Sequence, residues 1–208
     1  MKKLESSLLN MVLVLTGVAV IMGGILAYMN HLTEGPINEQ KVKALNDGIK
    51  VVMCNETAEM VKVDTVIKND AKGKELTYII YQIQNAQKQD LGAAVVSTTS
   101  GFGGNLKVLV GFDSEGKILG YTLLEHTETP GLGAKADKWF QKGQKGDIIG
   151  KSPAVPLTVK KDDGQIDAIT ASTITSRAFL LAINNAYNAY KATPASDAQT
   201  GASQQVKN

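Results

Sequence analysis

The hydrophobic pattern begins with an unbroken apolar stretch near the N-terminus. Residues 8–29 carry no charge, and Asn10 and Thr16 are the only strongly polar residues among them. A helix of that length spans about 33 Å, which is enough to cross the hydrocarbon core of a bilayer. The stretch is longer than a normal signal-peptide core and lacks a clear small-x-small cleavage site. We therefore predict a retained transmembrane helix rather than a cleaved leader.

The flanks of this stretch bear on its orientation and neighbours. Lys2 and Lys3 precede it, so the positive-inside rule places the N-terminus in the cytoplasm, although further lysines follow soon after the span. Small residues recur every fourth position on one side of the span and would let another helix approach closely, although such residues are common in membrane helices in general. These residues are Ala19, Gly23 and Ala27.

The pattern after the apolar stretch predicts an α+β domain. Residues 31–36 read as the exit from the membrane, and residues 38–60 carry apolar positions at helical spacing. A β-rich middle follows, and a last amphipathic helix starts between residues 172 and 175 and runs to about Tyr190. We expect an antiparallel sheet with flanking helices. The predicted strands are 76–83, 93–99, 106–112, 117–124, 157–160 and 165–169, with turns at 69–74 and 113–116 and a short helix around Trp139 and Phe140.

These elements define the expected organisation of the chain. It comprises a cytoplasmic N-terminus (1–7), a transmembrane helix (8–29), one extracytoplasmic domain (30–192) and a disordered tail (193–208).

Composition narrows the function classes. The 208 residues are 43% hydrophobic and 20% charged, which suits a packed domain, and the net charge of +2 is too small to indicate a nucleic-acid partner. With Cys54 as its one cysteine, the chain can form neither an internal disulfide nor a cysteine-ligated cluster by itself. The two histidines lie far apart, so no metal site is expected. We expect Cys54 to be a small buried hydrophobe.

Three segments could carry chemistry. Residues 167–177 place five hydroxyl side chains at a strand-to-helix junction, where they can cap the helix or, with its free N–H groups and Arg177, hold a phosphate. Residues 125–133 end a strand in a turn with Pro130 and two glycines, which suits either a surface turn or close approach of a ligand. Residues 100–104 form a glycine cluster that does not match a nucleotide fingerprint but could lie against a planar ring.

Together these segments resemble the FMN-binding domain family, in particular the G subunit of the Rnf-type ion-translocating oxidoreductases and the related C subunit of the sodium-pumping NADH:quinone reductase. The resemblance rests on residues 128–133, the hairpin before them and residues 167–177, and it runs from the span to about Tyr190. In that family FMN is esterified through its phosphate to the last residue of a Ser/Thr-Gly-Ala-Ser/Thr motif. The matching stretch is residues 170–173, which makes Thr173 the implied attachment point. Ala171 replaces the usual glycine, and it would be disfavoured if that position needs a positive φ.

The resemblance also implies the rest of the site. Residues expected to bind the flavin are Thr129, Pro130, Gly131, Leu132, Gly133, Thr170, Ser172, Thr175 and Arg177, with Ser172 and Thr175 as backup acceptors. A separate flavin transferase using FAD would make the link. The implied function is electron transfer between other membrane subunits of an ion-translocating complex, with no catalysis by this chain alone. Two alternatives remain. One is a role as the C subunit of the sodium-pumping reductase. The other is an anchored module that is structural or binds a ligand without a covalent link.

Overall fold

The computed structural model describes residues 8–69 and 75–192. The predictions for residues 1–7, for the core of the turn at 69–74 and for the tail at 193–208 lie outside the described residues. The chain divides into two compact units, residues 1–45 and residues 46–208, which are considered separately.

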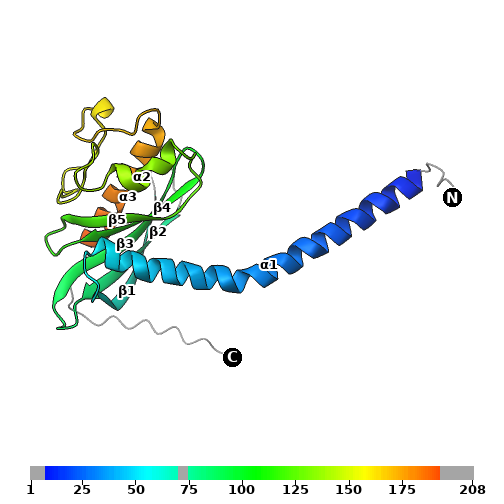
Figure 1. Ribbon diagram of the computed structural model, residues 1–208, viewed down its shortest axis with the longest axis horizontal. Coiled ribbons are helices and arrows are strands. Elements are labelled where there is room, and N and C mark those ends of the chain that lie inside the picture. The colour runs from blue at the N-terminus through cyan, green and yellow to red at the C-terminus, as the bar shows by residue number, and fades with distance from the viewer. Residues whose placement is uncertain (1–7, 70–74, 193–208) are drawn as a thin grey trace. The chain divides into compact units, whose positions relative to one another are not determined.

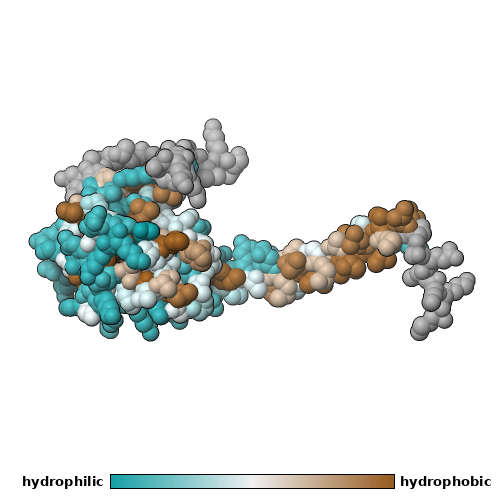
Figure 2. Space-filling model, turned by 90° about the horizontal axis from the view of Figure 1, so that it is seen from above, coloured by the Kyte–Doolittle hydropathy of each residue, from teal (hydrophilic) through white to brown (hydrophobic). Residues whose placement is uncertain are grey.

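The first unit is the greater part of α1 (Leu8–Val52), a helix of 45 residues. Every large apolar side chain between Leu8 and Met29 is at least 48% exposed, and Figure 2 shows hydrophobic surface all along this stretch. By length and composition α1 can cross a membrane. Such a surface requires an apolar environment that the chain itself does not supply.

The predicted separation of two helices at residues 31–36 is wrong, because α1 continues through Pro36. Proline lacks the backbone donor and crowds the preceding turn, which usually ends or kinks a helix. Here the hydroxyl of Thr33 donates to the carbonyls of Met29 and Asn30, at 2.9 and 3.2 Å, within the turn before the proline. Good helix-forming residues follow on the other side.

The second unit is built on a five-stranded antiparallel sheet, which confirms the predicted α+β class (Figure 1). The strands follow one another in chain order, as expected for a meander of hairpins. They are β1 (Glu59–Asn69), β2 (Glu75–Gln84), β3 (Asp90–Ser100), β4 (Asn105–Phe112) and β5 (Ile118–His126).

The edge strand β1 is absent from the predicted strands. The sequence pattern extends the preceding helix over its first residues, whereas the structure ends that helix at Val52. The segment alternates β-branched and polar residues, and Val63 and Ile67 stay exposed because the strand lies at the edge of the sheet. A half-exposed apolar pattern of this kind fits a helix and a strand almost equally well.

The main core lies between one face of the sheet and α3 (Thr173–Ala192), which packs across β3 and β4. Alternate residues of β4, among them Val108 and Val110, point into this core. The apolar face of α3 supplies Phe179 and Ile183, both fully buried. The predicted last helix is thereby confirmed, and it begins at Thr173.

The opposite face of the sheet receives the last two turns of α1. Gly111 and Gly120 are paired across β4 and β5, and the backbone of Val52 lies directly against both. A side chain at Gly111 would overlap the Val52 carbonyl. Glycine at both positions therefore lets the backbone at the end of α1 contact the backbone of β4 and β5 directly.

The segment between β5 and α3 holds only short helices: η1 (Gly133–Lys135), α2 (Ala136–Trp139) and η2 (Lys160–Asp162). The predicted strand pair at 157–160 and 165–169 is wrong, because these segments meet in a single parallel bridge between Val159 and Ile166. The residues between them form the tight η2 turn, closed by Asp163 in the left-handed region at φ 58°. That geometry does not set up an antiparallel hairpin.

Aromatic packing fixes α2 against α3. The ring of Phe179 stacks on Phe140 at a centroid distance of 4.3 Å and meets Tyr121 edge-on at 4.7 Å. The Tyr121 hydroxyl donates to the carbonyl of Ala136 at 2.7 Å, and burial raises the pKa of this phenol. The strand β5, the helix α2 and the helix α3 are thus joined near the start of α3.

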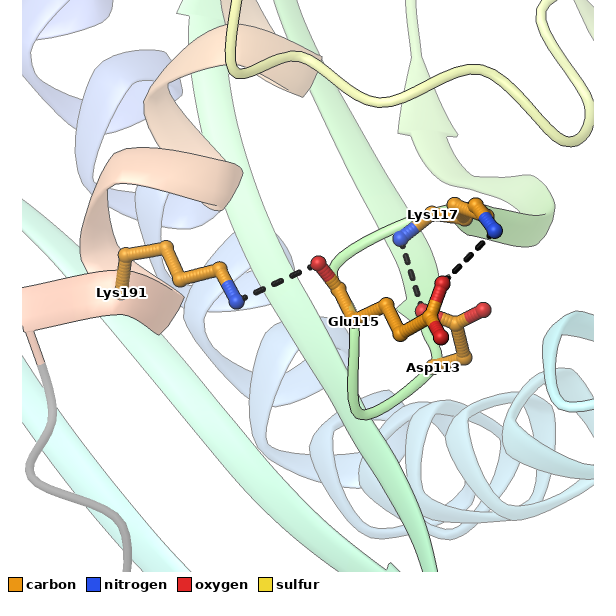
Figure 3. Close-up of polar contacts among 4 residues, drawn as sticks. All are labelled: Asp113, Glu115, Lys117 and Lys191. Carbon is orange, nitrogen blue, oxygen red and sulfur yellow. Dashed lines mark hydrogen bonds and ion pairs between the residues drawn. The ribbon is translucent and has the colours of Figure 1, made fainter.

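The predicted turn at residues 113–116 is confirmed, and it is tied to the other end of α3 (Figure 3). The Asp113 carboxylate accepts from the Lys117 amide at 2.8 Å, and Glu115 pairs with the Lys117 ammonium at 2.6 Å. Lys191 of α3 donates to the Glu115 carbonyl at 3.3 Å. This cluster anchors the C-terminal part of α3 far along the helix from Thr173.

The expectation for Cys54 is wrong. The residue is exposed and lies in the left-handed region, at φ 51°, in the turn after α1. In this conformation the Cys54 side chain lies outside the core, whereas Met53, in the same turn, is buried.

Candidate functional site

A buried carboxylate joins the three segments that stand out in the sequence. Glu128 follows β5 and is 5% exposed. One of its oxygens accepts from the backbone amides of Phe102 and Gly103, at 2.7 and 3.2 Å. The other accepts from the hydroxyl of Thr175 at 2.7 Å. Glu128 therefore holds the glycine cluster, the turn after β5 and the start of α3 together.

Glycines make room for this carboxylate. A side chain at Gly101 would overlap one Glu128 oxygen, and a side chain at Gly133 would overlap the other. Gly104 adopts φ +150°, and the Thr127 hydroxyl donates to the Gly103 carbonyl at 2.9 Å. Gly101 and Gly133 are thus explained by how closely they pack around Glu128, whereas Gly103 and Gly104 lie against Thr127.

The buried hydroxyls at the start of α3 are engaged within the protein. Ser172 donates to the Thr175 hydroxyl at 2.9 Å, which extends the chain of hydrogen bonds from Glu128. Ser176 donates to the Ser172 carbonyl and accepts from the Ile169 amide. We refer to Glu128, Thr175 and Ser172, with the amides of Phe102 and Gly103, as the Glu128 network.

Two hydroxyls of the same segment remain open to solvent. Thr170 is exposed, and Thr173, the first residue of α3, is half-buried. The Thr173 hydroxyl accepts a hydrogen bond from the Lys161 ammonium at 3.3 Å. Thr173 therefore combines access, a helix N-terminus and a neighbouring cation, which are the features that favour a bound phosphate.

The backbone of Ala171, the residue before Ser172, is strained. Ala171 has φ +60°, the left-handed conformation in which glycine is preferred. The turn thus requires a positive φ where the family motif has glycine, and this chain tolerates alanine there. The conformation turns Ser172 into the protein while Thr170 stays outside.

Arg177 lies one turn along α3 from Thr173 and is paired with an acid. Its guanidinium donates to both carboxylate oxygens of Asp162, at 2.7 and 2.5 Å. Hydrogen bonds from Arg177 hold the pKa of Asp162 below its usual value, and Asp162 in turn raises the pKa of Arg177. The cation in contact with the Thr173 hydroxyl is Lys161, which has no distinguishing signal in the sequence.

The turn predicted to line the flavin is open on its outer side. Residues 129–132 are mostly exposed, and Gly133 is buried against the Glu128 network. The Thr129 carbonyl accepts from the amides of Leu132 and Ala134, and Gly131 adopts φ +76°. These bonds fold the turn so that Leu132 is 41% exposed.

Two further apolar side chains are exposed beside the network. Phe102 is 69% exposed, and Ile174 is 54% exposed. The Phe102 amide donates directly to Glu128, Leu132 precedes Gly133, and Ile174 precedes Thr175. Phe102, Leu132 and Ile174 thus each belong to or adjoin in sequence a residue of this site, and exposed apolar side chains of this kind can contact a planar aromatic ring.

Sequence reasoning identifies the three segments but misses the residue that joins them. Glu128 belongs to the motif after β5, yet nothing in the sequence shows which acid meets the free amides of residues 102 and 103. Phe102 and Lys161 are likewise absent from the predicted site. His126, between two glutamates, is exposed at the end of β5.

Comparison with known proteins identifies the family of this chain. The family model of the FMN-binding domain matches residues 101–188, a range that includes Glu128, Thr173 and both loops. The G subunit of the ion-translocating oxidoreductase complex of Shewanella baltica (strain OS223) is 31% identical over 81% of this chain and 82% of its own length. The protein of the same name from Aliivibrio fischeri (strain ATCC 700601 / ES114) is 33% identical over 86% of this chain and 88% of its own length. The one from Yersinia pestis is 33% identical over 78% of this chain and 80% of its own length. At this identity and coverage, the chain belongs to the G-subunit family of ion-translocating oxidoreductase complexes.

Proposed function

We propose that this chain is a membrane-anchored electron-transfer subunit that carries FMN esterified to Thr173. The observation that carries the proposal is the open Thr173 hydroxyl at the first residue of α3, beside Lys161, within the FMN-binding domain. The chain works with other subunits of the complex and is held in the membrane by α1.

Burial favours Thr173 over its neighbours as the attachment point. Thr175 and Ser176 are fully buried, and Ser172 is 9% exposed and already donates to Thr175. An enzyme that transfers FMN must reach the hydroxyl it modifies. Thr173 is accessible and is also the residue implied by the family motif, whereas Thr170, although exposed, is not the last residue of that motif.

The proposed link is a simple group transfer. In a flavin transferase, the Thr173 oxygen would attack the FMN phosphorus of FAD, forming one P–O bond while the bond to AMP breaks. The hydroxyl proton leaves with the departing AMP or to solvent. This chain need not supply a catalytic base, since the transferase would provide it.

The residues around Thr173 fit the rest of the cofactor. The exposed side chains of Leu132, Phe102 and Ile174 would offer apolar contact to the ring, and residues 129–131 and 133 would bring backbone groups to its edge. Thr170 and the start of α3 would lie beside the phosphate end, and Ser172 and Thr175 shape the turn that presents Thr173. When bound, FMN supplies the electron-transfer chemistry, and the chain tethers and orients it.

The arrangement in the membrane follows from α1 and the flanking lysines. Residues 1–7 would lie in the cytoplasm, and the domain would lie on the outer side of the inner membrane. A tethered cofactor suits that location because it cannot diffuse away. With a single candidate span among the described residues, ion movement is assigned to other subunits.

The test compares Thr173→Ala with Thr173→Ser and Ser172→Ala. Each full-length variant is produced with the flavin transferase, run on a denaturing gel and inspected for flavin fluorescence. Mass spectrometry then examines the peptide covering residues 162–177. We expect fluorescence in wild type, Thr173→Ser and Ser172→Ala, and its loss in Thr173→Ala. Fluorescence retained in Thr173→Ala, or an unmodified wild-type peptide, would overturn the proposed attachment.

A second test examines the ring contact. Leu132→Glu places a charge beside the ring and should shift the absorbance or the reduction potential of the bound flavin, whereas Val155→Glu, at an exposed position, should not. Unchanged spectra and potential in Leu132→Glu would remove Leu132 from the pocket.

A further inference from the structure

Lys161 occupies a distinctive position within the η2 turn. Its ammonium lies 3.3 Å from the hydroxyl oxygen of Thr173. Its two neighbours are each committed to an ion pair, Lys160 with Asp167 at 2.8 Å and Asp162 with Arg177. Lys161 is thus the member of this turn whose positive charge is directed at a neutral oxygen.

The turn holds Lys161 in place through packing and hydrogen bonds. Val159 and Ile166, on either side of the turn, are each 1% exposed, and the Lys160 amide donates to the Ile166 carbonyl at 2.9 Å. The two hydrogen bonds between Arg177 and Asp162 fasten the same turn to α3. The backbone of Lys161 is therefore fixed on both sides by the fold, and from there its ammonium reaches the Thr173 hydroxyl.

The charges around Thr173 favour an anion bound at its hydroxyl oxygen. The Asp162 carboxylate would repel a nearby phosphate, but its charge is balanced by Arg177. The N-terminal end of α3 contributes a positive partial charge, and Lys161 contributes a full one. A lysine bound to a neutral hydroxyl gains little, whereas the same lysine next to a phosphodiester gains a charge-assisted hydrogen bond.

We propose that Lys161 is a positioning residue that pairs with the phosphodiester on Thr173 and fixes the orientation of the attached flavin. This inference rests on the proposed attachment at Thr173. In this arrangement Arg177 neutralises Asp162 and keeps the η2 turn against α3.

The test measures how much the covalent flavin stabilises the full-length protein. Wild type, Lys161→Met, Lys161→Arg and Lys160→Met are each purified in detergent from hosts with and without the flavin transferase. Thermal unfolding of each pair gives the shift in melting temperature caused by the flavin. Lys160→Met is the matched control, because it removes the same charge from the adjacent residue of the same turn.

We expect the flavin to raise the melting temperature of Lys161→Met by about 3 °C less than that of wild type. Lys161→Arg should recover most of the difference, and Lys160→Met should behave like wild type. Without flavin, Lys161→Met should match wild type to within about 1 °C, since an exposed lysine contributes little by itself. High salt should shrink the difference between flavinylated wild type and Lys161→Met.

Equal flavin-dependent shifts in wild type and Lys161→Met would overturn the inference while leaving the attachment intact. An equal loss in Lys160→Met would also overturn it, because the effect would then reflect net charge alone. A wild-type protein without covalent flavin would overturn the attachment itself, and the inference with it.

Discussion

The first turn of α3 has a closed side and an open side that are built by opposite means. On the closed side, Ser172 and Thr175 are buried and linked through hydrogen bonds to Glu128. On the open side, Thr173 is accessible and contacts a solvated cation, Lys161. Hydroxyls of one short segment thus have two roles. Those on the closed side stabilise the fold, and Thr173 on the open side is the proposed attachment point of the cofactor.

The difference shows why residue type alone does not identify an acceptor. Serine and threonine at a helix start satisfy free backbone groups in most proteins, and three of the hydroxyls here are used within the protein. What distinguishes Thr173 is that its hydroxyl contacts Lys161 and that it is less buried than Ser172, Thr175 and Ser176. Variants that open the closed side or relax the turn between the two sides test this distinction.

The largest effect is expected from Glu128→Ala. The change leaves the buried Thr175 hydroxyl and two partly buried backbone amides without their acceptor, which should lower the free energy of unfolding by about 3 kcal/mol. Chemical denaturation of the full chain measures this. Glu125→Ala, at the exposed end of β5, is the control and should cost less than about 0.5 kcal/mol. Similar losses in both variants would show that the Glu128 network is not a stabilising element.

A smaller loss is expected from Gly133→Ala. The added methyl group would overlap a Glu128 oxygen and lie 2.8 Å from the Thr175 hydroxyl oxygen, which should cost about 2 kcal/mol. Gly131→Ala is the matched control, because that position has a positive φ but open space, and it should cost about 1 kcal/mol from backbone strain. The same denaturation experiment ranks the two, and the reverse order would contradict the close packing around Glu128.

A gain is expected from Ala171→Gly. Relief of the positive φ should stabilise the domain by about 0.5–1 kcal/mol, because the strain removed exceeds the added flexibility of the unfolded chain. Ala178→Gly, inside α3, should instead destabilise by about 1 kcal/mol. Melting temperatures that fall in both variants would mean that residue 171 is not strained.

The smallest effect concerns the open side and its pH dependence. Because Arg177 lowers the pKa of folded Asp162 below the usual 3.8, this pair stabilises the folded state above that pH. The contribution disappears as the pH falls through the lowered pKa and Asp162 becomes protonated. Thermal unfolding from about pH 6 to about pH 3 should therefore show a slightly weaker acid dependence in Asp162→Asn than in wild type. Identical profiles would show that the pair contributes no measurable stability.

Much of the fold is predictable because its signals are local. The apolar span, the hairpin turn before Lys117 and the amphipathic last helix each follow from the spacing of neighbouring residues. The errors arise where tertiary packing decides. The segments near Val159 and Ile166 form a turn and one bridge instead of strands. The error at Pro36 is different in kind, because the exposed helix continues there through local hydrogen bonds.

The candidate site shows the same division. The hydroxyl-rich segment and the turn before Gly133 are identifiable from sequence, and the attachment to Thr173 remains a prediction. The meeting of Glu128 with the amide of Phe102, 26 positions away in sequence, depends on how β4 and β5 pair, and no local pattern encodes it. The position of Lys161 depends in the same way on the packed η2 turn.

The backbone contact between Val52 and the glycine pair has a consequence for how such chains can diverge. The end of α1 fits against the sheet because Gly111 and Gly120 have no side chains. The contacting atoms of Val52 are backbone atoms, so a substitution on the helix cannot make room for a larger residue at position 111. A library with every residue tested there should return glycine alone among folded clones, while Val52 itself can vary more freely. The space that glycine leaves at position 111 is therefore occupied by the helix end, and no other residue can replace that glycine during evolution.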